Sequence, residues 1–289
     1  MESVLNGSAA LVTGASRGFG LHIARAFVRS GASVWLTARS DHDLLAAKDE
    51  LEAECTLPDQ RIEITALDLG DRGALEGLVS DVHARWPQWN ILVNNAAVQG
   101  PIGPLWTNAM AEWEQTLRVD LFAPVALCRL AVPVLASSRR GKIINISGGG
   151  ATGPRVNFSA YASAKAALVR FSETLAEEAR TLGVDVNCVA PGAMNSTMTR
   201  EVVSAGPERS GVEYEKAVKQ LQGEGASPER AAALCVFLAS KDSDGITGKL
   251  ISAMWDPWET LAQFTQKLAE TDVYTLRRIV PADRGFEVT

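Results

Sequence analysis

The stretch AALVTGASRGFG, residues 9–20, decides how this chain folds. Its first four residues are apolar and are followed by a threonine and a glycine, which predicts a short buried strand. After Gly18 the apolar residues Ile23 and Phe27 recur at helical spacing, so a helix is predicted directly after the turn. A strand that enters a helix through a glycine-rich turn is typical of the first half of a βαβ unit.

The rest of the chain repeats this alternation of short apolar runs and longer amphipathic stretches. Such alternation predicts an α/β fold in which right-handed crossovers join parallel strands and helices cover both faces of the sheet. Ser227 as a cap and Pro228 as the first helical residue predict a last helix before the final strand. The predicted strands are residues 9–12, 33–37, 62–67, 91–93, 142–146, 184–189 and 249–252.

Two segments are expected along the chain. Residues 1–253 contain neither a repeat nor a long Pro/Gly/Ser-rich linker, which predicts one domain, and the motifs described below predict that this domain is the dinucleotide-binding and catalytic one. Residues 254–289 follow the last strand and continue in a further helical pattern that contains Trp255 and Trp258. We expect this C-terminal extension to pack on the domain or on a partner subunit.

Composition excludes several classes of protein. Lys and Arg total 28 against 34 Asp and Glu, and no basic run is present, so no nucleic-acid partner is expected. No apolar run approaches the roughly 20 residues that a membrane helix needs. The beginning of the chain shows no signal-peptide pattern, and the four cysteines are scattered without metal-ligand spacing. These features predict a cytoplasmic protein with no metal site and no membrane partner.

The glycine-rich turn predicts a binding site for a dinucleotide. Glycine lets the backbone turn tightly and approach a pyrophosphate, whose charge the free N–H groups and the positive end of the next helix stabilise. A glycine-rich turn without a ligand is the alternative, but the position between a strand and a helix disfavours it. The residues expected to bind the cofactor here are Gly14, Ser16, Arg17, Gly18, Phe19 and Gly20.

The end of the second strand predicts which dinucleotide binds. About 20 residues after the glycines, dinucleotide folds usually place an acidic residue on the adenosine ribose, but this chain has Arg39. A guanidinium can instead bind a 2′-phosphate, and Arg17 could contribute from the other side. We therefore expect NADP(H) rather than NAD(H). The alternatives are a solvated Arg39 and a ribose-binding Asp41, although Asp41 fits the start of the next helix better.

Tyr161 and Lys165 are the candidates for the chemical step. They lie four residues apart in a stretch of strong helix formers, residues 159–182, so both side chains leave the same face of a helix. A phenol is a poor base at neutral pH, but an adjacent ammonium favours the phenolate and lowers its pKa. The pair would then act as a general acid and base for a carbonyl and an alcohol.

Several motifs in a fixed order resemble the short-chain dehydrogenase/reductase family. The resemblance covers about residues 5–253 and is carried by the set of motifs together, because each alone is common. It implies a Rossmann-like sheet of seven strands, a homodimer or homotetramer, and hydride transfer between a nicotinamide and a small-molecule substrate. The motifs are the glycine turn, Asp68 after the third strand, Asn94-Asn95-Ala96-Ala97 after the fourth, Tyr161 with Lys165, and Pro191-Gly192 after the sixth.

The resemblance also implies a role for each matching residue. Tyr161 exchanges the proton, and Lys165 holds the nicotinamide ribose and lowers the pKa of Tyr161. Asp68 faces the adenine, with Leu69 beside it among the cofactor-binding residues. Further residues implied to line the cofactor cleft or to lie against the nicotinamide carboxamide are Asn94, Ala96, Pro191, Gly192, Met194 and Thr197.

One departure from the family concerns the hydroxyl that binds the substrate oxygen. The family usually has a serine thirteen residues before the tyrosine, where this chain has Gly148, preceded by Ser147. Either the glycine loop lets Ser147 reach the site, which we favour because glycine has the necessary backbone freedom, or Asn157 or Ser159 substitutes. The remaining alternative is that Ser147 only ends the strand.

A second departure is Asp120, where the family usually has an asparagine. A carboxylate there could pair with Lys165, and its charge would oppose formation of the Tyr161 phenolate. The expected consequence is a shifted pH optimum. The alternative is a solvated aspartate on a helix face.

The sequence thus predicts an NADP(H)-dependent oxidoreductase that interconverts a ketone and a secondary alcohol. Residues 194–225 form a predicted lid whose mixed charges, Glu201, Arg209, Glu213 and Lys216, mildly favour a polar substrate, although surface solvation explains them equally well. Because of Gly148 and Asp120, the alternative is an NADP(H)-binding sensor or scaffold with impaired catalysis. A sugar epimerase or dehydratase ranks last, because the glycine spacing resembles the short, one-domain branch of the family.

Overall fold

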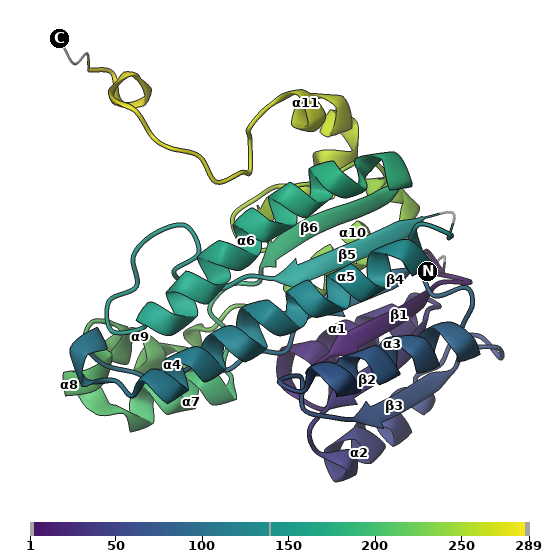
Figure 1. Ribbon diagram of the computed structural model, residues 1–289, viewed down its shortest axis with the longest axis horizontal. Helices are drawn as coiled ribbons and strands as arrows, with labels where there is room; N and C mark the ends of the chain where they lie inside the picture. The colour runs from purple at the N-terminus through teal and green to yellow at the C-terminus, as the bar shows by residue number, and fades with distance from the viewer. Residues whose placement is uncertain (1–2, 139, 287–289) are drawn as a thin grey trace.

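One parallel sheet forms the centre of the protein (Figure 1). The computed structural model describes residues 3–138 and 140–286. The strands are β1 (Ala9–Thr13), β2 (Ser33–Ala38), β3 (Ile62–Ala66), β4 (Ile91–Asn94), β5 (Gly141–Ile146), β6 (Val184–Ala190) and β7 (Leu250–Ser252). They pair in the order β3-β2-β1-β4-β5-β6-β7, and every pair is parallel. The predicted sheet is confirmed, with each strand end within one residue of its expected position.

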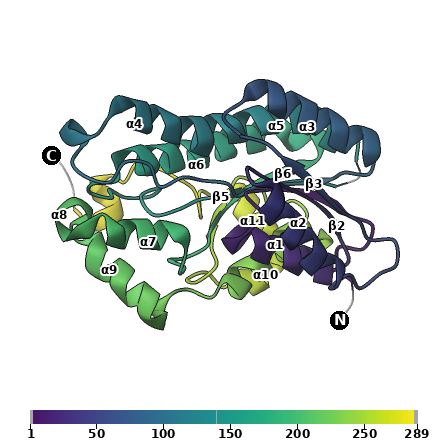
Figure 2. The same cartoon turned by 90° about the horizontal axis from the view of Figure 1, so that it is seen from below.

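Helices cover both faces of the sheet (Figure 2). They are α1 (Gly18–Arg29), α2 (Asp41–Glu52), α3 (Arg72–Arg85), α4 (Met110–Leu117), α5 (Ala123–Leu135), α6 (Ser159–Ala179), α7 (Thr197–Ser204), α8 (Gly206–Ser210), α9 (Glu213–Lys219), α10 (Pro228–Ala239) and α11 (Thr265–Glu270). The side chains of α1, α2 and α10 pack on one face, and those of α3, α5 and α6 pack on the other. None of the helices described combines the length and the apolar character needed to span a membrane.

β1 shows why the sheet needs two apolar cores. It lies between β2 and β4 and is buried along its whole length. Ala10 and Val12 enter the core under α1 and α10, whereas Ala9 and Leu11 enter the core under α3 and α5. Successive residues of a strand point to opposite faces, so a strand covered on both sides must be apolar throughout.

The predicted lid lies at the carboxyl ends of the strands. It is formed by α7, α8 and α9, which contact one another in sequence. A small apolar cluster ties the lid to the domain, in which Val202 and Ala217 pack with Ile102 and Phe158. Phe158 immediately precedes α6, so the lid is anchored next to the helix that carries Tyr161.

The C-terminal extension packs on the domain up to Leu276. Trp258, Leu261 and Leu268 are buried in the same core as α1 and α10. The carbonyl of Tyr274 then accepts a hydrogen bond of 2.8 Å from the amide of Leu250, so the extension pairs with the outer edge of β7. Beyond Leu276 the chain leads away from the body (Figure 1).

We predict that Trp258→Ala destabilises the whole domain. Its ring is 8% exposed and packs at 6.0 Å from the ring of Phe237, so truncation leaves a cavity in the main core. The expected loss is about 3 kcal/mol or more in the free energy of unfolding, measured by urea denaturation. Trp255→Ala is the matched control, because Trp255 is 87% exposed and its loss should change stability by about 0.5 kcal/mol or less. A loss of stability in Trp258→Ala as small as that in Trp255→Ala would show that the extension does not unfold together with the domain.

Candidate active site

The glycine turn is held by close backbone contacts. Gly14 has φ +64°, and a Cβ there would lie 2.8 Å from Cα of Ala96. A Cβ at Gly20 would lie 2.3 Å from the carbonyl oxygen of Gly14 and 2.5 Å from Nδ2 of Asn95. The turn can therefore close on itself and on the end of β4 only because these positions lack side chains.

The other side of the turn is open to a ligand. Gly18 has φ +58°, and a Cβ there would meet no atom within 4 Å. The N-cap residue of α1 is the exposed Arg17, and neither a side-chain cap nor an acidic residue occupies the first turn of this helix. The free N–H groups and the positive end of α1 are thus available to an anion, which fits a pyrophosphate. Ser16 and Phe19 are partly buried in the same segment.

Exposed polar residues follow the ends of β2 and β3. Arg39 is exposed after β2, whereas Asp41 is the first residue of α2, as expected, with Ser40 as the cap. Asp68 is also exposed, and its carboxylate accepts a 2.8 Å hydrogen bond from the amide of Gly70. Leu69 packs against the core instead. Arg39 and Asp68 are therefore the residues of this group that are open to a cofactor.

Asn94 and Asn95 hydrogen-bond to different parts of the structure, a difference that the sequence did not predict. The amide of Asn94 is buried and donates a 2.8 Å hydrogen bond to Oδ1 of Asn145 on β5. The amide of Asn95 donates to the carbonyls of Thr13 and Gly14, at 2.9 and 3.1 Å. Asn95 is thus the residue that braces the glycine turn. Its position after a strand, in a pair of asparagines, was the only signal for this role.

The residues after β6 lie between the lid and the last strand. Gly192 has φ +90°, and a Cβ there would lie 2.7 Å from both Cβ of Ala226 and Cγ of Met254. The carbonyl of Met194 accepts a 2.7 Å hydrogen bond from Oγ1 of Thr199. The neighbours Pro191 and Thr197 are partly buried and exposed, respectively.

The lid also lies close to the glycine turn. Burial raises the pKa of Glu201 on α7, and the guanidinium of Arg17 opposes this rise. Glu201 on α7 is therefore close enough to the glycine turn for its charge to interact with that of Arg17.

Tyr161 and Lys165 are buried together at the end of β5. Both lie on α6, and Nζ of Lys165 donates a 3.0 Å hydrogen bond to the carbonyl of Ile146, the last residue of β5. The ammonium lies 5.6 Å from the centre of the Tyr161 ring. The prediction that both side chains share one face of a helix is confirmed.

The expected direction of the Tyr161 pKa is wrong for this structure. Burial raises the pKa of Tyr161 above its usual value, and the charge of Asp120 raises it further, while Arg155 opposes the rise. Burial also lowers the pKa of Lys165, against the effect of Asp120. The sequence spacing predicted that Lys165 lies near the phenol, but it could not predict that the phenol is buried away from water. This burial has the largest effect on the pKa of Tyr161. Burial and the charge of Asp120 therefore both favour the neutral phenol over the phenolate at Tyr161.

Asp120 is a buried residue, so the alternative of a solvated aspartate is wrong. It lies in a wide π-helical turn, Arg118–Phe122, between α4 and α5, and its side chain is fully buried. Oδ1 accepts a 2.8 Å hydrogen bond from the amide of Val98, while Oδ2 lies 3.9 Å from Nζ of Lys165 and has no hydrogen-bond partner among the described residues. Burial raises the pKa of Asp120 to about 6, against the lowering effects of Lys165 and the Val98 amide.

Gly148 is closely packed against the phenol. A Cβ at this position would lie 2.2 Å from Oη of Tyr161 and 2.9 Å from Cζ. The hydroxyl of Tyr161 thus occupies the space that a side chain at residue 148 would need. A serine there would require Tyr161 to move.

Ser147 lies on the face of the sheet that α6 covers. Its amide donates a 2.8 Å hydrogen bond to the carbonyl of Val189, which continues the pairing of β5 with β6. Two residues earlier, Asn145 donates to Ser172 on α6, and side chains two apart on an extended strand share a face. Oγ of Ser147 is buried without a hydrogen-bond partner among the described residues.

The other substitutes for a serine are occupied or strained. Oγ of Ser159 accepts a 3.2 Å hydrogen bond from the indole N–H of Trp113. Asn157 has φ +69°, and its carbonyl accepts a hydrogen bond from the amide of Gly103. Ser147 thus has a buried hydroxyl without a hydrogen-bond partner among the described residues, whereas the hydroxyl of Ser159 is engaged by Trp113.

Arg155 is a site residue that sequence reasoning missed. Its guanidinium lies 5.5 Å from the centre of the Tyr161 ring and 3.9 Å from that of Phe158. Nε donates a 3.2 Å hydrogen bond to Oε2 of Glu213 on α9. No motif marks Arg155, because only the path of the loop between β5 and α6 brings it to the phenol.

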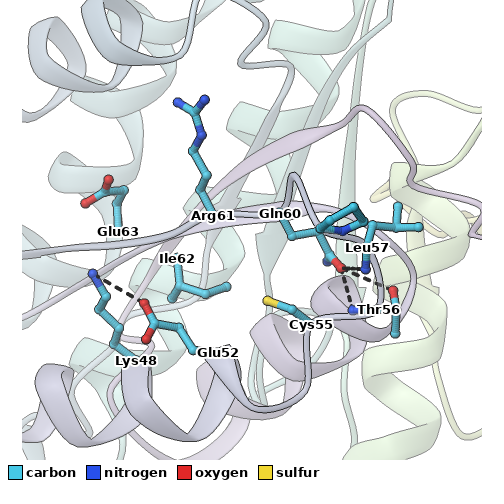
Figure 3. Close-up of a pocket in the computed structure, with 10 residues that line it drawn as sticks. Lys48, Glu52, Cys55, Thr56, Leu57, Gln60, Arg61, Ile62 and Glu63 are labelled. Atoms are coloured by element: carbon cyan, nitrogen blue, oxygen red, sulfur yellow. Dashed lines mark hydrogen bonds and ion pairs between the residues drawn. The ribbon is translucent and has the colours of Figure 1, made fainter.

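A separate hollow lies where β3 begins, at the opposite end of that strand from Asp68 (Figure 3). Lys48 and Glu52 form an ion pair of 3.6 Å on one wall, and Gln60 accepts hydrogen bonds from the amides of Thr56 and Leu57 on another. Charges of both signs line it, and it contains none of the predicted site residues. We assign the chemistry to the carboxyl ends of the strands.

The chain is similar to known proteins in both sequence and fold. The sequence model described as short chain dehydrogenase matches residues 8–206. The chain is 34% identical over 238 residues to L-fucose dehydrogenase of Oryctolagus cuniculus, covering 82% of this chain and 80% of that protein. It is 32% identical over 245 residues to 3-oxoacyl-(acyl-carrier-protein) reductase of Salmonella typhimurium, covering 85% and 95%. Among solved structures, a short chain dehydrogenase from Shigella flexneri complexed with NADP is 25% identical, with a TM-score of 0.76 and coverage of 88% and 99%.

Proposed function

The chain belongs to the short-chain dehydrogenase/reductase family, and we propose that it interconverts a ketone and a secondary alcohol with NADP(H). Family membership makes it an oxidoreductase of alcohol and carbonyl groups. The observation that most supports the finer assignment is the burial of Tyr161, Lys165 and Asp120 together at the end of β5. Perturbed ionisable groups that converge beside a cofactor cleft are typical of a reaction centre.

The glycine turn and the strand ends would hold the cofactor. Gly18 leaves room for a pyrophosphate at the N-terminus of α1, while Gly14 and Gly20 let the turn close and Asn95 braces it. Asp68 would face the adenine, and the residues after β6 would lie against the carboxamide. When bound, the nicotinamide supplies or accepts the hydride at the substrate carbon.

Tyr161 would exchange the proton with the substrate oxygen. In the direction of reduction, the neutral phenol donates its proton to the oxygen of the ketone as the carbonyl carbon is reduced. Lys165 keeps its ammonium close to the phenol, which stabilises the phenolate left after proton transfer. We propose that the unpaired Ser147 hydroxyl donates a hydrogen bond to the same substrate oxygen.

The choice of NADP(H) rests on two arginines. Arg17 and Arg39 are exposed beside the cofactor end of the site, and neither has an ion-pair partner among the described residues. A 2′-phosphate offers the planar acceptor set that a guanidinium binds well. The NADP complex of the Shigella flexneri relative supports this choice.

The compartment and the oligomeric state of the protein are further parts of the proposal. We propose a cytoplasmic homo-oligomer, with the free Cys55, Cys128, Cys188 and Cys235 suited to a reducing compartment. The second candidate function is a sensor or scaffold that binds NADP(H) but does not turn over. The replacement of the expected serine by Gly148 is what favours it.

We predict that Tyr161→Phe lowers kcat for NADPH-dependent ketone reduction about 10²- to 10⁴-fold, because the proton donor is lost. Turnover is measured by NADPH absorbance with a panel of ketones, and NADPH affinity by fluorescence titration. Tyr214→Phe on α9 is the matched control and should retain turnover. A Tyr161→Phe enzyme with wild-type kcat would contradict the proposal, and a wild-type protein that binds NADPH but reduces no ketone would favour the sensor.

We predict that Arg39→Met weakens NADPH binding about 10- to 100-fold but leaves NADH binding nearly unchanged, since charged hydrogen bonds to the 2′-phosphate are lost. Fluorescence titration of both dinucleotides measures the ratio of their dissociation constants. Arg61→Met, at the exposed start of β3, should leave that ratio unchanged. If Arg39→Met weakened both dinucleotides equally, Arg39 would not read the phosphate.

We predict that Asp120→Asn moves the rise of alcohol oxidation with pH to lower pH by about one unit. The pKa of Asp120 is about 6, so the carboxylate is ionised above that pH and there raises the pKa of Tyr161. Asparagine carries no charge at any pH, so the phenolate forms at lower pH and the inflection near pH 6 disappears. Profiles of kcat against pH measure this, with the exposed Asp81→Asn as control. Superimposable profiles of Asp120→Asn and wild type would refute the role of Asp120.

A further inference from the structure

A guanidinium lies beside the phenol and takes no part in the reaction described above. The side chain of Arg155 is 17% exposed, and its guanidinium carbon lies over the ring of Phe158, 3.9 Å from the ring centre. This contact and the burial restrict the guanidinium, whose carbon lies 5.5 Å from the centre of the Tyr161 ring. A long side chain at this position is therefore ordered rather than free in solvent.

Most of the hydrogen-bonding capacity of Arg155 remains unused. Nε donates to Oε2 of Glu213, but Nη1 and Nη2 have no acceptor within hydrogen-bond distance among the described residues. A guanidinium carries five N–H donors in a fixed fork, and the terminal groups suit a carboxylate. An ordered guanidinium with free terminal N–H groups is a ready site for a carboxylate ligand.

Two adjacent glycines connect this guanidinium to the reacting phenol. Cβ positions built on Gly148 and Gly149 point to different partners: the first lies 2.2 Å from Oη of Tyr161, and the second lies 3.9 Å from Cζ of Arg155. The phenol oxygen and the guanidinium thus flank a backbone segment that carries no side chains. Gly149 is exposed and Gly148 is partly exposed, so this segment can be reached by a small molecule.

Glu213 links Arg155 to the predicted lid. Its Oε1 accepts a 2.8 Å hydrogen bond from Lys216 while Oε2 accepts from Arg155, so one carboxylate on α9 holds a cation of the lid and a cation of the domain. Burial raises the pKa of Glu213, but the hydrogen bonds and charges of Lys216 and Arg155 outweigh this and hold the pKa below its usual value. Glu213 is therefore ionised at neutral pH and orients Arg155.

From this geometry we infer that Arg155 is the binding site for the carboxylate of a short oxo acid or hydroxy acid whose reacting oxygen lies at Tyr161. The inference rests on the proposed reaction at Tyr161 and specifies its substrate class. A ligand that spans the Gly148-Gly149 segment places its carbonyl oxygen at the phenol and its carboxylate at the free N–H groups of Arg155. The stacking on Phe158 and the contact with Glu213 set the direction of those groups.

Matched pairs of acids and esters test this inference. Pyruvate, acetoacetate and levulinate, each with its methyl ester, are supplied as substrates to the NADPH-bound enzyme, and kcat/KM is measured for each. The wild type should prefer at least one acid to its ester by about tenfold or more, and Arg155→Met should lower that preference about 10- to 100-fold, mainly through KM. No preference for any acid in the wild type overturns the inference, and so does an equal loss of acids and esters in Arg155→Met.

Two variants separate recognition from a structural role in the lid. Glu213→Gln removes the charge that orients Arg155 but leaves the guanidinium beside Phe158, so the acid preference should fall by less than it does in Arg155→Met. Lys216→Met removes the other cation bound to Glu213 and should leave the preference at the wild-type value. If Glu213→Gln lost the preference as fully as Arg155→Met, Arg155 would act only through the lid.

Binding without turnover separates failure of this inference from failure of the proposed function. Calorimetric titration of the preferred acid into NADPH-loaded Tyr161→Phe should give a dissociation constant about tenfold or more below that of Tyr161→Phe/Arg155→Met. When no acid is turned over, all three are titrated. Tighter binding to the Tyr161→Phe protein, together with an inactive wild type, would retain the carboxylate site and reject the reaction. Equal dissociation constants in the two proteins would reject the carboxylate site.

Discussion

The site depends on two buried charges that lie too far apart for a full hydrogen bond. Lys165 and Asp120 are 2% and 0% exposed, and their closest charged atoms are 3.9 Å apart. Burying an ion costs several kcal/mol unless other groups compensate it. Here the carbonyl of Ile146 compensates the ammonium and the amide of Val98 compensates the carboxylate. Ile146 is the last residue of β5 and Val98 lies in the loop after β4, so backbone groups at this edge of the sheet fix the two charges near Tyr161.

Burial of the phenol decides what these charges do to it. Tyr161 has lost most contact with water, which raises its pKa, and Asp120 and Arg155 act in opposite directions on this raised value. The pKa of this phenol on α6 is therefore set by burial and by two side chains from other segments, Arg155 in the loop before α6 and Asp120 in the turn between α4 and α5. A wide π-helical turn places Asp120 among them, and such turns are common at functional sites.

Close backbone contacts fix the glycine turn, at the end of the site where the cofactor is proposed to bind. Gly14 and Gly20 touch each other, Ala96 and Asn95 at distances that no side chain would allow. At Gly148 the same restriction applies to the chemical end, where the Tyr161 hydroxyl occupies the space of a side chain. The glycine at this position and the place of the phenol are therefore two aspects of one packing arrangement. Ser147 precedes Gly148 in the chain and Arg155 lies beside Gly149, and these are the two groups that we propose for the substrate.

Local patterns determined the fold and the main reacting groups. Apolar runs gave every strand to within a residue, the glycine turn gave the first βαβ unit, and the Tyr161–Lys165 spacing gave a shared helix face, because each depends only on neighbours along the chain. Only the tertiary structure decided the burial of Asp120, the raised pKa of Tyr161, the bracing role of Asn95 and the place of Arg155. These properties depend on which segments from elsewhere in the chain pack around a residue and exclude water or supply its hydrogen-bond partner. The spacing of residues along the chain does not predict that packing.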